Sequence, residues 1–143
     1  ITAIGAKEVF GYPIFGQLLK LYGGIPIKRT HLKSALKSLS LVEDAINNGI
    51  SFIIAPEGTR TLNGELSTFK KGPFHLAKNT GVTIVPIALM GGLEAKRKDN
   101  WRLKPGVLTT RFGEPIKVEE YGDLEVEEIS ELVRSRIETL IEA

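Results

Sequence analysis

Hydrophobic residues recur along the chain at two kinds of spacing, which predict two kinds of element. In residues 32–47 an apolar side chain stands at every third or fourth position and the sequence Asn-Asn-Gly closes the stretch, which predicts an amphipathic helix and its end. A second pattern of this kind begins near Asp123 and predicts a closing helix. The apolar face of that helix consists of Val126, Ile129, Val133, Ile137 and Leu140.

Shorter apolar runs predict the strands of a sheet. Two short helices are expected between them, over residues 14–22, which glycines end, and over residues 73–79, which Pro73 opens. Because Pro86 cannot donate a hydrogen bond, a bulge or a strand end is expected there. Strands separated by helices favour an α/β fold, a layered domain with a largely parallel or mixed sheet flanked by helices. The predicted strands are residues 1–7, 25–28, 51–55, 82–89 and 107–112.

The composition fits a single globular domain. A chain of 143 residues with 42% hydrophobic content is expected to bury a substantial core, so one domain is predicted over residues 1–143. No run approaches the roughly eighteen apolar residues of a membrane-spanning helix, so any membrane anchor is expected outside the chain. The absence of cysteine excludes a disulfide framework and a thiolate zinc site. With 2 histidines and no spaced carboxylate cluster, no bound metal is expected.

The small net charge of +2 hides a strong asymmetry. Residues 1–113 carry 16 Lys and Arg against 7 Asp and Glu, whereas residues 114–143 carry 3 against 10. A basic body suits an anionic lipid surface or a phosphorylated substrate. Ordinary solvated charge with an acidic closing helix is the alternative. Nucleic acid is not favoured as a partner, because the basic residues are not interleaved with aromatic ones.

The sequence Pro-Glu-Gly-Thr-Arg, directly after the predicted strand 51–55, is a candidate site for a phosphate. Gly58 allows the backbone to approach an oxyanion, Thr59 offers a hydroxyl, and Arg60 supplies a planar, permanently charged fork. Glu57 is expected either to orient Arg60 or to tie down the loop, since a carboxylate repels phosphate. A polar turn without a ligand is the alternative reading of this segment.

Other cations are predicted to lie near the same edge of the sheet. Lys7 ends the first predicted strand, and Lys28 and Arg29 end the second. The carboxyl ends of parallel strands meet at one edge, where ligands bind in open α/β sheets. Lys70 and Lys71 precede the helix that Pro73 opens, and the free amides of a helix start also favour an anion.

The order of these segments resembles that of a known family. The sequences Gly-Gly-Ile-Pro-Ile-Lys-Arg at 23–29, Pro-Glu-Gly-Thr-Arg at 56–60, Phe-Lys-Lys-Gly-Pro at 69–73 and Ile-Val-Pro-Ile-Ala-Leu at 84–89 follow one another. Together they resemble the glycerophospholipid acyltransferases, the family of 1-acylglycerol-3-phosphate and glycerol-3-phosphate acyltransferases. The resemblance covers roughly residues 4–115, and the Pro-Glu-Gly-Thr-Arg block is its most specific part.

The resemblance implies transfer of a fatty acyl group in phospholipid biosynthesis. The donor would be acyl-CoA or acyl-carrier protein, with no further cofactor, and the acceptor a hydroxyl of lysophosphatidate or glycerol 3-phosphate. Arg60 would clamp the phosphate, Arg29 and Lys7 would add charge, and Gly58 and Thr59 would donate hydrogen bonds. Such an enzyme is expected at a membrane surface, on its cytoplasmic face.

The family's catalytic His-x-x-x-x-Asp motif is not found in this chain. The residues five positions after His31 and His75 are Leu36 and Thr80. The histidine and the aspartate are therefore expected upstream of Ile1, and the isolated chain is expected to lack activity. Three alternatives remain open: a family member without the base, a non-catalytic module that binds lipid phosphates, and an acyltransferase for another lysolipid.

Overall fold

The computed structural model describes residues 2–27, 32–97, 100 and 102–143. Within it the chain forms two compact units, residues 1–54 and residues 55–143. The single domain that the composition predicts over residues 1–143 stays a prediction. None of the helices in the described ranges is long and apolar enough to cross a bilayer.

The first unit is a parallel sheet with helical connections. Its three strands lie in the order β2-β1-β3, and both pairs are parallel. In the register Ile4 pairs with Ile25 and Ala3 with Ile53. Helix α2 contacts β2. The elements are β1 (Thr2–Ala6), the 3-10 helix η1 (Lys7–Gly11), α1 (Phe15–Leu21), β2 (Ile25–Ile27), α2 (Leu32–Asn47) and β3 (Phe52–Ile53).

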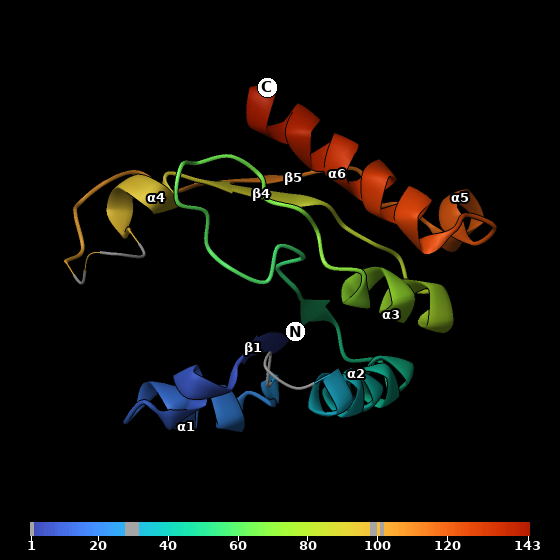
Figure 1. Cartoon of the computed structure of the whole chain (residues 1–143), viewed down its shortest axis with the longest axis horizontal. Helices are drawn as coiled ribbons and strands as arrows, with labels where there is room; N and C mark the ends of the chain where they lie inside the picture. Colours follow the sequence, from blue (N-terminus) through green and yellow to red (C-terminus); the bar gives the residue numbers. More distant parts are fainter. Residues whose placement is uncertain (1, 28–31, 98–99, 101) are drawn as a thin grey trace. The chain divides into compact units, whose positions relative to one another are not determined.

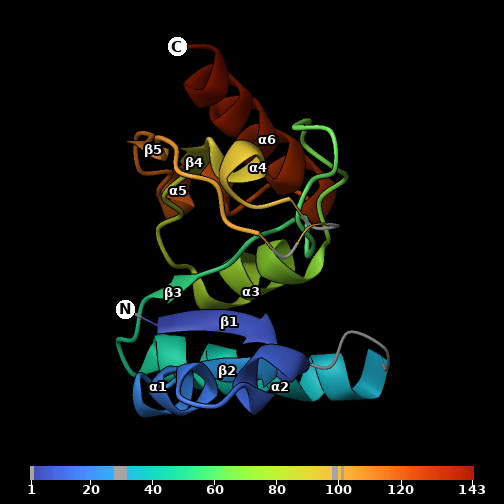
Figure 2. The same cartoon turned by 90° about the vertical axis from the view of Figure 1, so that its left-hand side faces the viewer.

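The second unit packs a long helix against a two-stranded antiparallel sheet. Helix α6 runs along β4 and β5 and also contacts α3 (Figures 1 and 2). An isolated bridge between Ile84 and Ile116 extends the pairing of β4 with β5. The elements are α3 (Gly72–Thr80), β4 (Ile87–Met90), α4 (Gly92–Ala95), β5 (Thr109–Phe112), α5 (Val118–Tyr121) and α6 (Val126–Glu142).

The core of the second unit is built from the apolar face of α6. Four of the five residues predicted for that face are buried, and Leu140 packs against them at the edge. Burying such side chains stabilises a fold by about 1.5–3 kcal/mol each. The buried core residues are Phe69, Phe74, Ala77, Ala88, Ile116, Tyr121, Val126, Ile129, Val133 and Ile137.

Tyr121 joins two segments of this core through its hydroxyl. The side chain is fully buried, and its oxygen lies 2.5 Å from the carbonyl of Val82 and 3.1 Å from that of Ala77. The hydroxyl donates its proton to these carbonyls and thereby links the end of α3 to the segment that leads into β4. Burial raises the pKa of Tyr121, with a smaller contribution from the charge of Glu119.

The helices match the predictions more closely than the strands do. Helix α2 has the predicted bounds, and α6 begins three residues after Asp123. Of the run 51–55, predicted as a buried strand, β3 comprises Phe52 and Ile53 in the described part of the chain, and Ile53 is 55% exposed. The strand predicted over 82–89 begins at Ile87 instead, since Pro86 interrupts the ladder. The combination of helices with parallel and antiparallel strands agrees with an α/β class.

Removing the Tyr121 hydroxyl is expected to weaken the second unit. Tyr121→Phe keeps the ring in the core but leaves the Val82 carbonyl without its donor, so the free energy of unfolding should fall by about 1–2 kcal/mol. Urea denaturation followed by circular dichroism measures this loss. Tyr12→Phe, at a side chain that is 61% exposed, is the matched control and should change little.

The same tyrosine predicts a loss of stability at alkaline pH. Its pKa is raised in the folded state, so the folded state holds the proton more tightly than the unfolded state does. Its contribution is therefore complete below the ordinary pKa of 10.0 and disappears as the pH rises through the higher folded value. Denaturation between about pH 8 and pH 11 should show a steeper decline for the wild type than for Tyr121→Phe. Equal slopes would contradict this assignment.

Candidate functional site

A tight turn carries the Pro-Glu-Gly-Thr-Arg sequence. The amide of Gly58 donates to the carbonyl of Ala55 at 3.1 Å, which closes a four-residue turn with Pro56 in its second position. Proline is favoured there because its φ is already set, and glycine is common in the fourth position. Gly58 has a φ of +69°, a conformation that other residues adopt only with strain. The local sequence thus dictates the shape of the backbone before Arg60.

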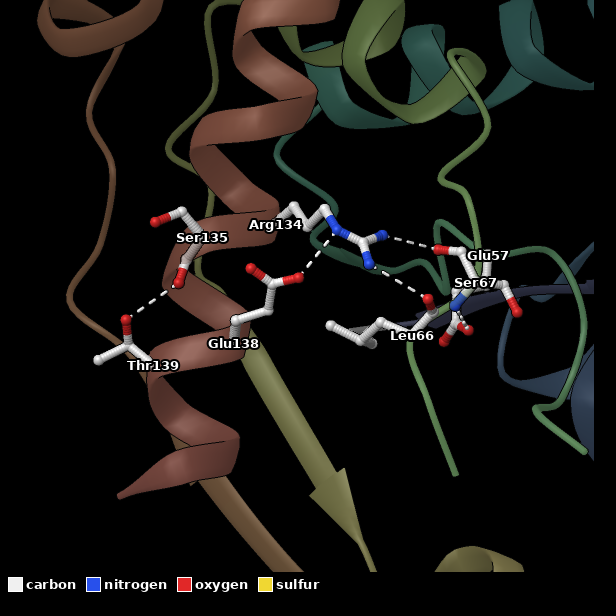
Figure 3. A network of polar contacts seen from close by, with 7 residues as sticks. All are labelled: Glu57, Leu66, Ser67, Arg134, Ser135, Glu138 and Thr139. Atoms are coloured by element: carbon white, nitrogen blue, oxygen red, sulfur yellow. Dashed lines mark hydrogen bonds and ion pairs between the residues drawn. The ribbon is translucent and has the colours of Figure 1, made fainter. Parts of the chain in front are cut away.

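Two hydrogen bonds close the loop that follows, residues 57–67, at its base. The amide of Ser67 donates to Oε2 of Glu57 at 2.8 Å (Figure 3). The amide of Lys70 donates to the carbonyl of Pro56, also at 2.8 Å. Glu57 is half-buried at this position. Of the two roles considered for Glu57, the structure thus supports tying down the loop.

The tip of the 57–67 loop is organised by its own polar side chains. The amide of Gly64 donates to the hydroxyl of Thr61 at 2.9 Å, and the amide of Glu65 donates to Oδ1 of Asn63 at 3.2 Å. The side-chain amide of Asn63 in turn donates to the carboxylate of Glu65 at 2.6 Å. Side-chain turns of this kind stabilise short loops without a core. Arg60 therefore lies between an ordered base and an ordered tip.

Arg60 and Thr59 are both exposed to solvent. The guanidinium of Arg60 makes no hydrogen bond or ion pair with any other residue that the structure describes. A guanidinium is permanently charged and has five N–H donors in a planar fork. The turn therefore presents an unused cationic group, as a phosphate site requires.

The two lysines after the loop differ in their surroundings. Lys70 is exposed, and its Cγ is the nearest atom to the position that a Cβ would take on Gly58, at 3.6 Å. Lys71 instead pairs with Glu127 at the start of α6. The hydrogen bond from Lys71 lowers the pKa of Glu127. Lys70 is thus the lysine beside the turn, whereas the charge of Lys71 is already matched.

The remaining predicted cations belong to the other unit or lie outside the described residues. Lys7 directly follows β1 and opens η1, so it stands at the carboxyl end of a parallel strand as predicted. Lys28 and Arg29 fall outside the described residues. The convergence of Lys7 and Arg29 with Arg60 therefore stays a prediction.

Arg134 is a residue of this region that the sequence did not single out. From α6 its Nη1 donates to the carbonyl of Ser67 at 2.9 Å and its Nη2 to that of Leu66 at 3.2 Å (Figure 3). Its Nε lies 2.9 Å from Oε1 of Glu138, and its guanidinium stands 5.4 Å from the centre of the Phe69 ring. The only sequence signal is the spacing of Arg134 and Glu138, which is common on exposed helices.

A hollow of about 380 Å³ lies beside Arg134, between the end of the loop and α6. Its walls carry both acidic and basic side chains, and Arg60 does not line it. Within the part of the chain that the structure describes, there is no group of three or more His, Cys, Asp or Glu side chains placed to hold a metal ion. The described site presents the exposed side chains of Arg60 and Lys70 beside the turn, and cationic groups of this kind attract anions.

Comparison with known proteins identifies the family. The model of the Acyltransferase family matches residues 1–90. The chain belongs to this acyltransferase family, which confirms the resemblance noted in its sequence. It is 36% identical to a 1-acyl-sn-glycerol-3-phosphate acyltransferase of Cocos nucifera, over 94% of this chain and 44% of that protein. It is 32% identical to the enzyme of that name from Salmonella typhimurium, over 98% of this chain and 57% of that protein.

A solved structure is similar over nearly the whole chain. It is the crystal structure of the 1-acyl-sn-glycerophosphate (LPA) acyltransferase PlsC from Thermotoga maritima. The TM-score is 0.86 and the identity 26%, and the match covers 99% of this chain and 55% of that one. The chain therefore spans about half the length of the proteins that it matches.

Loss of the Glu57 carboxylate is expected to open the base of the loop. In Glu57→Ala the amide of Ser67 loses its acceptor, so its hydrogen exchange should become about tenfold faster. Glu57→Gln retains an acceptor oxygen and should keep most of the protection. Glu65→Ala removes a carboxylate from the tip of the same loop and serves as the control. Unchanged exchange at Ser67 in Glu57→Ala would contradict the closure.

Proposed function

We propose that the chain carries the acceptor-binding part of an acyltransferase that esterifies a hydroxyl of lysophosphatidate. The observation that carries this proposal is the exposed guanidinium of Arg60 on an ordered turn, without a partner among the described residues. A lysophosphatidate phosphate presents oxygens that such a fork can grip in pairs. The similarity to enzymes named 1-acyl-sn-glycerol-3-phosphate acyltransferase supports this acceptor, and glycerol 3-phosphate has the same phosphate chemistry.

Binding the phosphate would accelerate the reaction by orientation. In the transfer, the acceptor oxygen forms a C–O bond with the acyl carbon while the C–S bond of the thioester breaks. The hydroxyl proton passes to a base, and the thiolate leaves and takes up a proton. Fixing the phosphate at Arg60 would hold the hydroxyl in one place, which replaces a loose encounter by an oriented one and supplies several kcal/mol of the barrier reduction, up to about 7–11 in ideal cases.

Other parts of this machinery are proposed from the resemblance. The base would be the histidine of a His-x-x-x-x-Asp motif, with the aspartate holding its imidazole in the useful tautomer. The donor would be acyl-CoA or acyl-carrier protein, which share the thioester, and no further cofactor would be needed. Such a protein would work at a membrane surface on the cytoplasmic side, where its acceptor lies, with its strands and helices in one layered α/β domain.

Three further cations are proposed to add positive charge at the phosphate site of Arg60. Lys7 and Arg29 would reach the phosphate from the carboxyl ends of β1 and of the predicted strand 25–28. Lys70 would add charge beside Gly58, because its side chain is exposed there. Lys71 is a weaker candidate than the sequence suggested, since Glu127 already pairs with it. The predicted backbone donation by Gly58 needs a correction, because its amide already donates to the carbonyl of Ala55. Gly58 would instead allow a close approach of the backbone, and the hydroxyl of Thr59 would donate.

The experiment replaces Arg60 in the gene product that carries this chain, including any residues that precede Ile1. Arg60→Ala should lower kcat/KM for lysophosphatidate by about 10- to 100-fold, because a charge-assisted, bidentate contact is lost. Arg60→Lys keeps the charge without the fork and should fall between. The measurement is transfer of a labelled acyl group from acyl-CoA and, separately, from acyl-carrier protein.

The matched control for this experiment is Arg136→Ala, at an exposed arginine on α6. It removes the same charge far along the chain and should leave kcat/KM unchanged. A normal rate in Arg60→Ala would remove the assigned role. Binding of lysophosphatidate without any transfer by the wild type would favour a non-catalytic module instead. Transfer to uncharged lysolipids at the same rate as to lysophosphatidate would point to a different acceptor.

A further inference from the structure

The 57–67 loop is held from outside by one side chain of α6. Arg134 reaches its last residues with both terminal nitrogens, at 2.9 Å to the carbonyl of Ser67 and 3.2 Å to that of Leu66 (Figure 3). The sequence separation is large, 67 residues for Ser67 and 68 for Leu66. Helix α6 is in turn anchored in the core by four buried residues. The loop is thus tied to the most firmly packed helix of its unit.

Ser67 receives constraints on both of its backbone groups. Its amide donates to Glu57, and its carbonyl accepts from Arg134. These two bonds connect α6 to Glu57 through a single residue, and Glu57 immediately precedes Gly58 in the turn. A hydrogen bond to a charged group is stronger than a neutral one. The position of the turn is therefore coupled to the guanidinium of Arg134.

We propose that Arg134 is a positioning residue for acceptor binding. It holds Ser67, Ser67 holds Glu57, and this chain of contacts fixes the turn from which Arg60 extends. The proposal rests on the proposed function, because it assigns Arg60 to the acceptor phosphate. Arg134 lies beyond residues 1–90, the part that the family model matches, so the closing helix adds a constraint from outside that segment.

The contacts of Arg134 require the shape of an arginine. Two nitrogens bind two carbonyls, while Nε lies 2.9 Å from Oε1 of Glu138 one turn further along the helix. The flat guanidinium also lies against the ring of Phe69, whose own ring stacks with that of Phe74 at 6.1 Å. A lysine has one nitrogen and no planar group, so it replaces only part of this set. With Glu138 beside it, the charge of Arg134 is already compensated within the protein, which suits a structural contact better than a phosphate contact.

The test compares Arg134→Met and Arg134→Lys with Arg136→Met in the same full-length gene product. Methionine keeps the apolar stem against Phe69 and removes every donor. We expect the amide of Ser67 to exchange about tenfold faster in Arg134→Met and less so in Arg134→Lys. The exposed Arg136 provides the identical substitution two residues away and should leave exchange at Ser67 unchanged.

Kinetics separate positioning from a general loss of stability. Arg134→Met should lower kcat/KM for lysophosphatidate by about 5- to 10-fold, and Arg134→Lys should recover part of it. In an Arg60→Ala background the same substitution should have no further effect, because the group that it positions is gone. A merely destabilising substitution lowers the active fraction equally in both backgrounds, so an equal loss would overturn the proposal.

The exchange measurement decides the positioning role independently of activity. Unchanged protection of Ser67 in Arg134→Met would contradict the positioning role whatever the rates. If the wild type transfers no acyl group to lysophosphatidate, the proposed function fails. In that case faster exchange at Ser67 in Arg134→Met still supports the hold of Arg134 on the loop.

Discussion

Closure of the 57–67 loop at its base is the constraint on which the described site depends. Glu57 accepts from Ser67, and Pro56 accepts from Lys70, so the chain leaves and returns at one place. An arginine on an open segment would have to be ordered by its ligand, and ordering a backbone residue costs about 1–2 kcal/mol. Because the base is closed beforehand, this cost falls on folding rather than on binding, which is how preorganisation improves affinity.

The helices could be predicted from the sequence because their signal is repeated. Residues 32–47 and the face from Val126 to Leu140 each show several apolar positions at helical spacing, and the core of the second unit is built on that face. The strands carried a weaker signal. An apolar run such as 51–55 does not reveal how much of it pairs, and the turn at Pro56 limits β3 to two residues. The short helices η1, α4 and α5 have too few residues to show a period.

The candidate site was predictable only where neighbouring residues build it. The turn at 55–58 follows from proline and glycine at fixed positions. The local sequence was therefore enough to predict that Arg60 lies just after a turn. Contacts between distant segments left no such mark. Nothing in the sequence assigns Lys71 to Glu127 or Arg134 to the carbonyl of Ser67, because those pairs arise from the packing of α6 beside the loop. Predictions made from charge alone therefore treated Lys71 as equal to Lys70.

The charge asymmetry of the chain has a structural meaning in the second unit. Two acidic residues of α6 are counter-charges for cations of the same unit, since Glu127 pairs with Lys71 and Glu138 with Arg134. Arg60 has no such carboxylate partner among the described residues. An exposed cation that the fold does not neutralise keeps its full attraction for an anion, whereas a paired one must first give up its partner. Two carboxylates of the acidic closing helix thus pair with Lys71 and Arg134, whereas Arg60 keeps its charge available for an anion.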